Sequence, residues 1–553
     1  MKATYSIGLD YGTESARALL VDVETGEIVA QAEKKYPDGV ISETLPKTDV
    51  RLPINWALQN PKDWLYAAEE TINTIVKTQE ILPEQVVGLG VDFTSCTLVP
   101  TLEDGTPLCW LEPLQNEPHA WPKLWKHHSP QDQAERITQL ALEMDQKWLH
   151  RYGGIVSSEW LLPKALELLE EKPELYKKTR FLVEGADWVI WQLTGILVQN
   201  SCCAGYKGTW HKRDGFPSKS FIETVNPDLS DLFEEKIQGK ILAPGEKVGY
   251  MSDKWAGKLG LSQTCAVSAG IIDAHSAAIG SGLSSSGSMF MIMGTSTCHM
   301  LMFTEEILVE GISGVVEDGI VPGFYGYEAG QVSVGDIFAW FVENCVPKEY
   351  QIEAEKSKQS IHQILTEKAL HLRPGETGLL SLDWWNGCRT PLVDADLTGL
   401  IMGLNLNTKP EEIYRALIEG TAFGTRLIID LFEEAGVTIS KLQVGGGLTK
   451  NELILKIYSD ITNLPIEVAS SQYSSALGAA ILGSVAGGYY PSIERAVEKM
   501  VMPSSKVILP DSDNHNYYSM IYDEYNKLAK LFGRDSDSSL KRMFGIREKV
   551  IRN

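Results

Sequence analysis

The sequence predicts an α/β protein made of two similar lobes with a ligand cleft between them. One order of elements occurs once in each half of the chain: a hairpin with a polar turn, then a long helix, then a strand that ends in small residues. The length of 553 residues suffices for two to four units at roughly 100–200 residues per domain. Ligands usually bind in the crevice between such lobes. We therefore place one lobe in residues 1–283 and the other in residues 284–553.

The first copy begins with alternating apolar and polar residues, which indicate short strands in a meander. A helix follows, because apolar residues from Trp64 to Val76 fall on one face at helical spacing. The next apolar run reads as a buried strand that ends at Thr94, Ser95 and Cys96. The predicted strands of this lobe cover residues 5–10, 16–23, 28–34 and 86–93.

The second copy is longer because the region of roughly residues 310–410 is expected to contain an insertion. A helix rich in small residues over 476–488 is expected to pack closely against a neighbour, and 517–531 is expected to form a peripheral amphipathic helix. Residues 533–553 are polar and are expected to be partly ordered at best. The other predicted elements are strands at 288–293, 299–303 and 442–444 and helices at 161–169, 187–193 and 413–434.

Charge and composition exclude several classes of function. The formal net charge of -23 argues against a nucleic-acid or anionic-membrane surface. No apolar run approaches about 18 residues, and the N-terminus has no apolar core of a signal peptide. The eight cysteines are scattered without a CxxC pair, as in a reduced protein without a zinc site. We therefore expect a cytoplasmic protein that binds neither nucleic acid nor membrane.

Three polar turns have the residue types of a phosphate site. The segment Asp10–Arg17 offers a carboxylate for Mg²⁺, a glycine, two hydroxyls (Thr13 and Ser15) and the cation Arg17. Gly294, Thr295 and Ser296 repeat this pattern in the second half. Three consecutive glycines then end a strand, and a surface without Cβ atoms suits a flat group such as adenine. Taken alone, the first two segments are better explained as ordinary hairpin turns, and a glycine-rich loop is weak evidence for a nucleotide site.

A single carboxylate, Asp273, follows the apolar strand that ends at Ile272. Phosphoryl transfer to a hydroxyl requires a base within hydrogen-bond reach of the attacking oxygen, and Asp273 fits that role. Helix capping is the alternative interpretation, since aspartate often caps helices. We interpret the nearby His275 as structural, because no nucleophile is paired with it.

The order and spacing of these motifs, followed by Ala476-Leu477-Gly478-Ala479-Ala480, resemble the FGGY carbohydrate kinases over about residues 4–500. The resemblance implies two actin-like (ribonuclease H-like) ATPase lobes with a catalytic cleft between them. It implies Asp273 as the catalytic base and Asp10 as the residue that places Mg²⁺. The residues expected to bind ATP are Gly12, Thr13, Ser15, Arg17, Gly294, Thr295, Ser296, Gly445, Gly446, Gly447 and Asn451.

The sequence at the end of the fourth strand indicates the sugar. Asp92-Phe93-Thr94-Ser95-Cys96-Thr97, Gly205-Tyr206-Lys207, Tyr327–Gln331 and Trp384–Arg389 resemble the members of this family that phosphorylate L-ribulose. By that resemblance Ser95, Cys96, Lys207, Asp273 and Glu328 bind the sugar. Ser95 departs from the alanine that the resemblance implies at this position, and it adds a hydroxyl to the pocket. Without the resemblance, Lys207 and Glu328 would read as solvated surface charges.

The resemblance implies phosphorylation of L-ribulose to L-ribulose 5-phosphate, a step of L-arabinose catabolism, with ATP and Mg²⁺. Lobe closure is expected to exclude water, because an open site would hydrolyse ATP. One alternative is a kinase for another pentulose or pentitol, such as D-ribulose, ribitol or xylulose. Another is a non-catalytic sugar or nucleotide sensor, although a pure binder has no need of a base. A chaperone-like ATPase is remoter, and a homodimer is expected only by analogy with the family.

Overall fold

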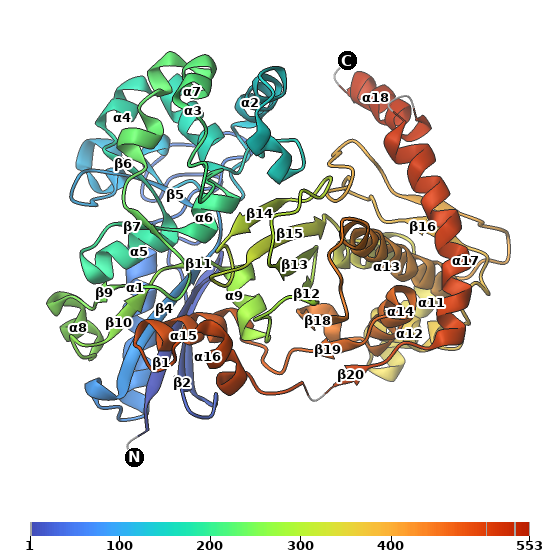
Figure 1. The fold of residues 1–553 in the computed structure, drawn as a ribbon. Coiled ribbons are helices and arrows are strands. Elements are labelled where there is room, and N and C mark those ends of the chain that lie inside the picture. Colours follow the sequence, from blue (N-terminus) through green and yellow to red (C-terminus); the bar gives the residue numbers. More distant parts are fainter. Residues whose placement is uncertain (1–2, 505, 536–537, 552–553) are drawn as a thin grey trace.

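The computed structural model describes residues 3–504, 506–535 and 538–551 and contains two seven-stranded sheets, one in each lobe (Figure 1). The first sheet has the order β3-β2-β1-β4-β10-β9. The short strand β11 pairs with the end of β4, whereas β10 pairs with earlier residues of the same strand. The second has the order β14-β15-β13-β12-β18-β19-β20. The strands of the first sheet are β1 (Tyr5–Tyr11), β2 (Ser15–Asp22), β3 (Ile28–Lys35), β4 (Val86–Phe93), β9 (Lys247–Tyr250), β10 (Ala266–Ser268) and β11 (Ile271–Ile272).

The two sheets share one plan. In the first, β1 runs antiparallel to β2 and parallel to β4; in the second, β12 runs antiparallel to β13 and parallel to β18. This repeat confirms the two-lobed α/β prediction. The strands of the second sheet are β12 (Ser288–Met293), β13 (Thr297–Phe303), β14 (Gly314–Glu317), β15 (Tyr325–Gln331), β18 (Lys441–Gly445), β19 (Ile466–Val468) and β20 (Val507–Ile508).

The predicted start of the insertion in the second lobe, at about residue 310, was wrong. The region interpreted as an insertion, 310–410, contains β15, which pairs with β13 along its whole length and is the third strand of the second meander. The sequence Tyr325–Gln331 (YGYEAGQ) has two glycines and a glutamate, so its strand pattern is weak. Pairing with β13 and β14 on both sides stabilises it as a strand.

Each lobe has one long helix between its meander and its parallel strand. Asn60 caps α1 (Pro61–Thr78) by accepting a hydrogen bond from the Lys62 amide, and Pro61 occupies the first helical position. Its apolar face, which includes Trp64, is buried on the first sheet. The equivalent helix in the second lobe is α13 (Pro410–Glu434), which also begins with proline.

The helix α15 (Ser474–Ala486) belongs to the C-terminal half of the chain but packs on β1 and β4 and against α9 (Asp273–Gly280) (Figure 1). Glycines permit this contact: a Cβ on Gly8 would lie 1.8 Å from the Ala476 carbonyl oxygen, and one on Gly90 would lie 1.9 Å from that of Ala479. The predicted close packing of this helix is therefore confirmed. Because the chain returns to the first lobe here, the division at residue 283 stays a prediction.

The remaining helices cover the lobes. In Figure 1 the helices α2, α3, α4 and α7 gather at the top end of the first lobe, and the long α17 runs along the far side of the second. They are α2 (Gln131–Glu143), α3 (Leu161–Glu171), α4 (Pro173–Lys178), α5 (Gly185–Thr194), α6 (Ser201–Tyr206), α7 (Lys219–Val225), α8 (Asp253–Leu259), α10 (Gly335–Asn344), α11 (Lys348–Ser357), α12 (Ile361–Ala369), α14 (Glu452–Thr462), α16 (Ile493–Met500), α17 (Ser512–Ala529) and α18 (Ser539–Ile551).

The remaining strands form three short pairs. They are β5 (Leu98–Thr101) with β6 (Phe181–Glu184), β7 (Val198–Asn200) with β8 (Lys240–Leu242), and β16 (Leu380–Leu382) with β17 (Leu400–Met402). The helix α18 corrects the expectation that residues 533–553 are at best partly ordered; positions 536–537 and 552–553 lie outside the described residues. In the described ranges, no helix combines the length and apolar character needed to cross a membrane.

Candidate active site

A cavity of about 240 Å³ lies where the two lobes meet, and residues from both lobes line it. The first lobe contributes Thr13 from the β1–β2 turn and Ser95 from the loop after β4. The second contributes Ser296 from the β12–β13 turn and Glu328 from β15. The full lining is Thr13, Thr94, Ser95, Trp125, Glu159, Lys207, Ile272, Asp273, Ala274, His275, Ser296, Cys298, Met300, Glu328 and Arg389.

Asp273 lies in this cavity because of strand pairing. The short strand β11 runs parallel to β4, with Ile272 opposite Phe93, so the chain leaves the sheet at its carboxyl edge and begins α9 with Asp273. One carboxylate oxygen accepts a hydrogen bond from the Ala274 amide at 2.7 Å. Burial, followed by the negative charge of Asp10, raises the pKa of Asp273 to about 7. A carboxylate with this pKa is poised to act as a base near neutral pH.

Two further aspartates lie at the same sheet edge. Asp10 and Asp92 are opposite each other on the parallel strands β1 and β4. Neither carboxylate oxygen of Asp92 has a hydrogen-bond partner among the residues that the structure describes. Burial and the neighbouring Asp10 raise the pKa of Asp92 well above its ordinary value. Asp92 was not predicted as a site residue. Its position at the end of a buried strand matches that of Asp10 and could have indicated a role.

These carboxylates do not form a complete protein metal cage. Within the described ranges, no group of three or more histidine, cysteine, aspartate or glutamate side chains is arranged to hold a metal ion. Mg²⁺ usually takes only one or two carboxylates, together with water and substrate phosphates. Asp10 is partly engaged by Arg17 at 3.6 Å, whereas the Asp92 oxygens are unpartnered within the described chain. The donor set therefore fits a magnesium ion shared with a nucleotide.

Lys207 and Glu328 form a buried pair across the lobes. The Lys207 Nζ lies 3.3 Å and 3.5 Å from the two Glu328 oxygens. Both residues are less than 10% exposed, so the interpretation as solvated surface charges is wrong. Burial by itself would lower the pKa of Lys207, but the charge of Glu328 raises it overall. Lys207 lowers the pKa of Glu328 in turn, against the effect of burial, so both side chains are charged at neutral pH.

The loop after β4 places Ser95 and Cys96 differently. Ser95 lines the cavity, whereas Cys96 lies outside the lining and packs in the hydrophobic cluster under the helical part of the first lobe. Cys96 has a left-handed backbone with φ of 57°, and its carbonyl accepts a hydrogen bond from the fully buried Lys164. Of these two neighbours, only Ser95 is therefore in position to contact a sugar directly.

The first predicted phosphate turn is only partly directed at the cavity. Thr13 lines it, and its hydroxyl accepts a hydrogen bond from the Trp125 indole at 3.1 Å. Ser15 instead donates to Glu33 at 2.7 Å on the exposed side of β2. Arg17 pairs with Glu33 and Asp10 and lies over the Tyr473 ring. The amide of Gly12 closes the turn by donating to the Ser15 carbonyl.

The second predicted phosphate turn joins β12 to β13. The amide of Gly294 donates to the Ser296 carbonyl at 2.9 Å. A Cβ on Gly294 would meet nothing closer than 3.9 Å, so its surface is open to a ligand. The Thr295 carbonyl accepts from the Val334 amide, which fixes the turn against the start of α10. Of the three residues, Ser296 lines the central cavity.

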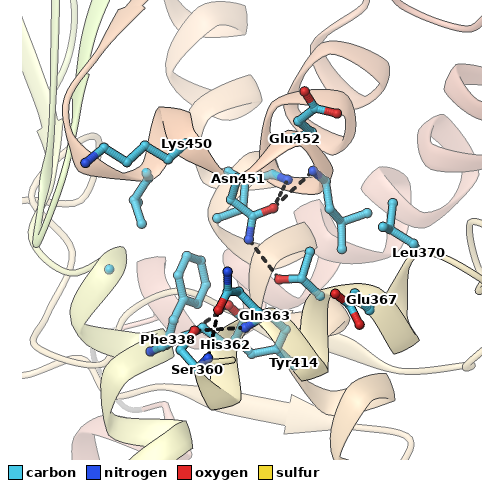
Figure 2. A pocket seen from close by; sticks show the side chains of 16 residues that line it. Phe338, Ser360, His362, Gln363, Glu367, Leu370, Tyr414, Lys450, Asn451 and Glu452 are labelled. Atoms are coloured by element: carbon cyan, nitrogen blue, oxygen red, sulfur yellow. Dashed lines mark hydrogen bonds between the residues drawn. The ribbon is translucent and has the colours of Figure 1, made fainter. Parts of the chain in front are cut away.

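A larger cavity of about 680 Å³ lies within the second lobe, beside the triple glycine. Figure 2 shows Phe338, His362 and Tyr414 on one side of it and Lys450, Asn451 and Glu452 on the other. Its size and its aromatic and polar lining suit a nucleoside. Asn451 caps α14 through its side-chain oxygen and donates to the Thr366 hydroxyl. Its side chain therefore stabilises the cavity wall, because its oxygen and its amide group both already make hydrogen bonds within the protein.

The three glycines have separate positions. A Cβ on Gly447 would meet nothing within 4 Å, and Gly447 lines the nucleoside cavity. Gly446 has φ of 96°, and a Cβ there would lie 2.5 Å from the Met293 carbonyl oxygen. Gly445 ends β18 and lies outside the cavity lining. The prediction of a bare backbone surface beside a flat ligand therefore rests on Gly447, while Gly446 is required by the turn.

Several cavity residues were not assigned from the sequence. Arg389, Glu159 and Trp125 line the central cavity, and Arg389 and Glu159 also line an adjoining compartment of about 170 Å³. Arg389 belongs to a segment quoted for its resemblance to the family, which was a usable signal. Glu159 and Trp125 come from loops of the helical part of the first lobe, where no periodicity or turn motif marks them.

Comparison with known proteins identifies the family. The model of the N-terminal domain of the FGGY family of carbohydrate kinases matches residues 5–280, and that of the C-terminal domain matches residues 289–487. The chain is 48% identical over 551 residues to a protein named ribulokinase from Shouchella clausii, covering 99% of this chain and 98% of that protein. It is 47% identical to one from Geobacillus thermodenitrificans, covering 98% and 97%.

Solved structures agree on the fold. The xylulose kinase from Rhodospirillum rubrum matches with a TM-score of 0.79 at 19% identity, covering 95% of this chain and 98% of that one. The Plasmodium falciparum glycerol kinase with ADP matches with a TM-score of 0.75 at 18% identity, covering 95% and 98%. The paired lobes, the cavity between them and the two domain matches lead to one conclusion: the chain belongs to the FGGY family of carbohydrate kinases.

Proposed function

We propose that the protein transfers the γ-phosphoryl group of ATP to the 5-hydroxyl of L-ribulose, with Asp273 as the general base. The observation that carries this proposal is the position of Asp273, which shares one interlobe cavity with the buried Lys207–Glu328 pair. A ketopentose presents several hydroxyls and a carbonyl, and a cavity with both buried cations and buried carboxylates offers donors and acceptors to each. The name ribulokinase, which both relatives described above carry, supports ribulose over other sugars.

The reaction follows from the two cavities. The nucleoside binds beside Gly447 in the second lobe, and its phosphates extend toward the β12–β13 turn and Ser296. The sugar binds between Ser95, Lys207 and Glu328. Asp273 then accepts the proton of the sugar's 5-hydroxyl as the hydroxyl oxygen attacks the γ-phosphorus. The bond between the γ-phosphorus and the bridging oxygen breaks, and that oxygen leaves with ADP. Closure of the lobes excludes water, which would otherwise compete as the acceptor.

Asp10 and Asp92 would hold Mg²⁺, which neutralises phosphate charge in phosphoryl transfer. Support comes from the Asp92 oxygens, which have no partner among the described residues, and from the register that puts both carboxylates at one sheet edge. Asp10 also adds negative charge close to Asp273 and, after burial, helps to raise the pKa of that base.

The test is a coupled ADP-release assay over L-ribulose, D-ribulose, D-xylulose, ribitol and glycerol, with and without Mg²⁺. We expect the largest kcat/KM with L-ribulose and no ADP release without sugar. A larger value for another substrate would refute L-ribulose while leaving a kinase. Sugar binding by calorimetry without any turnover would favour a sensor.

Ser95 provides a matched variant for this panel. Ser95 lines the cavity, so Ser95→Ala removes one hydroxyl from the lining, and we expect the fold to stay unchanged. If Ser95 contacts the sugar, the ratio of kcat/KM between L-ribulose and its competitors changes by roughly 5- to 10-fold, the effect of one hydrogen bond. An unchanged ratio would show that the serine has no part in selectivity.

A further inference from the structure

Among the residues that the structure describes, His275 is a cavity residue whose side chain makes no hydrogen bond. It lies two positions after Asp273, lines the central cavity, and its side chain is only 1% exposed. Neither of its ring nitrogens has a hydrogen-bond partner in the described part of the chain. A buried polar group without a hydrogen bond destabilises the fold, so such a histidine in a binding cavity requires an explanation. The interpretation as a purely structural residue does not supply one.

The surroundings of His275 point to Glu328. The Nε2 atom lies 3.7 Å from Oε2 of Glu328, just beyond hydrogen-bond distance. The same oxygen lies 3.3 Å from the Lys207 Nζ. All contacts among these three side chains are longer than an ideal hydrogen bond, and hydrogen bonds in active sites often shorten when substrate binds. On its other side the ring packs against Tyr206, with ring centroids 4.4 Å apart, which fixes its orientation.

The charge state of the imidazole is set by burial. Burial lowers the pKa of His275 to about 4, so the ring is neutral at physiological pH and carries one N–H group. If that hydrogen is on Nε2, it faces the Glu328 carboxylate, which accepts hydrogen bonds only. The carboxylate then has Lys207 and His275 as two fixed donors and keeps lone pairs for a hydroxyl of the sugar.

We propose that His275 is a positioning residue for sugar binding: its Nε2–H group donates to Glu328 in the sugar-loaded cavity and holds that carboxylate toward a sugar hydroxyl. This rests on the proposed function, because it assumes that the cavity holds the sugar. The role is separate from the chemistry of Asp273, so it affects sugar affinity and selectivity more than the rate of phosphoryl transfer.

Three substitutions at one position test this proposal. His275→Phe keeps the ring against Tyr206 but removes both nitrogens, and it should raise the KM for L-ribulose roughly 10- to 100-fold, the effect of one hydrogen bond to a charged group. The kcat should stay within about 3-fold, and the KM for ATP should not change. His275→Gln places an amide nitrogen near the Nε2 position and should restore much of the affinity. His275→Asn places one near Nδ1 and should not. An unchanged sugar KM in His275→Phe, or rescue by asparagine instead of glutamine, would overturn the proposal.

A double-mutant cycle with Glu328→Gln tests the coupling directly. If His275 acts through Glu328, His275→Phe should have little further effect on sugar KM once Glu328 has been changed. Full additivity of the two effects would overturn the proposal even if His275→Phe alone is impaired.

His299→Phe is the control for loss of a buried histidine. It lies on β13 outside the cavity lining, donates to or accepts from Thr425 at 3.1 Å, and should lower stability without changing sugar KM. The wild-type protein separates the two ideas: if it phosphorylates no pentulose, the proposed function fails. If it does so and the His275 variants behave like wild type, only this inference fails.

Discussion

Replacing Asp273 with asparagine should abolish most turnover and at the same time make the protein more stable. Asparagine keeps the shape of the side chain and can still accept the Ala274 amide hydrogen bond, but it cannot accept a proton. Loss of a general base lowers kcat by about 100- to 10,000-fold. Because the base must be ionised, kcat/KM of the wild type should also fall about tenfold per pH unit below the Asp273 pKa of about 7.

The gain in stability follows from the same pKa. A rise from the ordinary value of 3.8 to about 7 means that the folded protein binds a proton between these pH values that the unfolded chain has released. The free energy of unfolding therefore falls as pH rises through this window, and above pH 7 the ionised carboxylate costs at most about 4 kcal/mol. The Asp273 side chain is only partly buried and lines the cavity, so the cost of ionising it is below this bound. Asp273→Asn removes this cost at pH 8. At pH 4 it removes nothing, because Asp273 of the folded wild type is protonated and therefore as neutral as asparagine.

The assay combines ADP release with denaturant unfolding at pH 8 and at the lowest pH at which the protein stays folded. Asp187→Asn is the matched control, because burial also raises the pKa of Asp187 to about 7, but this side chain lies outside the cavity lining and accepts hydrogen bonds from the backbone and side chain of Asn200. That variant should show the same pH dependence of the gain in stability, lowered at every pH by about 1–3 kcal/mol for the weakened hydrogen bonds, and it should keep its turnover. Turnover of Asp273→Asn within tenfold of wild type would remove Asp273 as the base. Equal stability of the two proteins at pH 8 would show that its pKa is not raised.

Three further predictions concern the two cavities and the packing between the lobes. Gly447→Val fills open space in the nucleoside cavity and should raise the KM for ATP about 10-fold in steady-state assays with little change in sugar KM, whereas Gly446→Val should reduce the yield of folded protein. Lys164→Met removes the hydrogen bonds that the Lys164 ammonium donates to the carbonyls of Cys96, Lys123 and Leu124. It should lower the free energy of unfolding by about 3 kcal/mol and raise the KM for the sugar. Unchanged values would show that Lys164 does not hold the loop that contains Ser95. Gly8→Ala forces a Cβ against α15 and should cost about 3 kcal/mol or more in denaturant unfolding, and a stable variant would show that this helix can move away from the sheet.

Much of the fold could be predicted because its elements have clear local patterns. The strand Val86–Phe93 is an apolar run between polar segments, and the helix Pro61–Thr78 has a cap, a first-turn proline and a continuous apolar face. The strand β15 was missed because glycines and a glutamate weaken its pattern, and its state depends on pairing with strands from other parts of the chain.

The candidate site was predicted unevenly for a similar reason. Asp273 and the glycine turns lie at the ends of apolar strands, where the sequence changes from apolar residues to polar or small ones. Cys96 was expected to touch the sugar because its motif resembles that of the family, but its left-handed backbone and the hydrogen bond from Lys164 to its carbonyl place it in the core. Glu159 and Trp125 come from irregular loops, and only the assembled lobe brings them to the cavity.

The sequence by itself determined which segments form strands and helices and which residue types occupy the strand ends, because hydrophobic periodicity and turn preferences act over a few neighbouring residues. The tertiary structure decided which of these ends meet. Parallel pairing of β1, β4 and β11 brings Asp10, Asp92 and Asp273 to one edge. The approach of the two lobes buries Lys207 with Glu328, 121 residues apart, and leaves His275 beside them. Such contacts depend on the burial of whole sheets and helices, which no short stretch of sequence encodes.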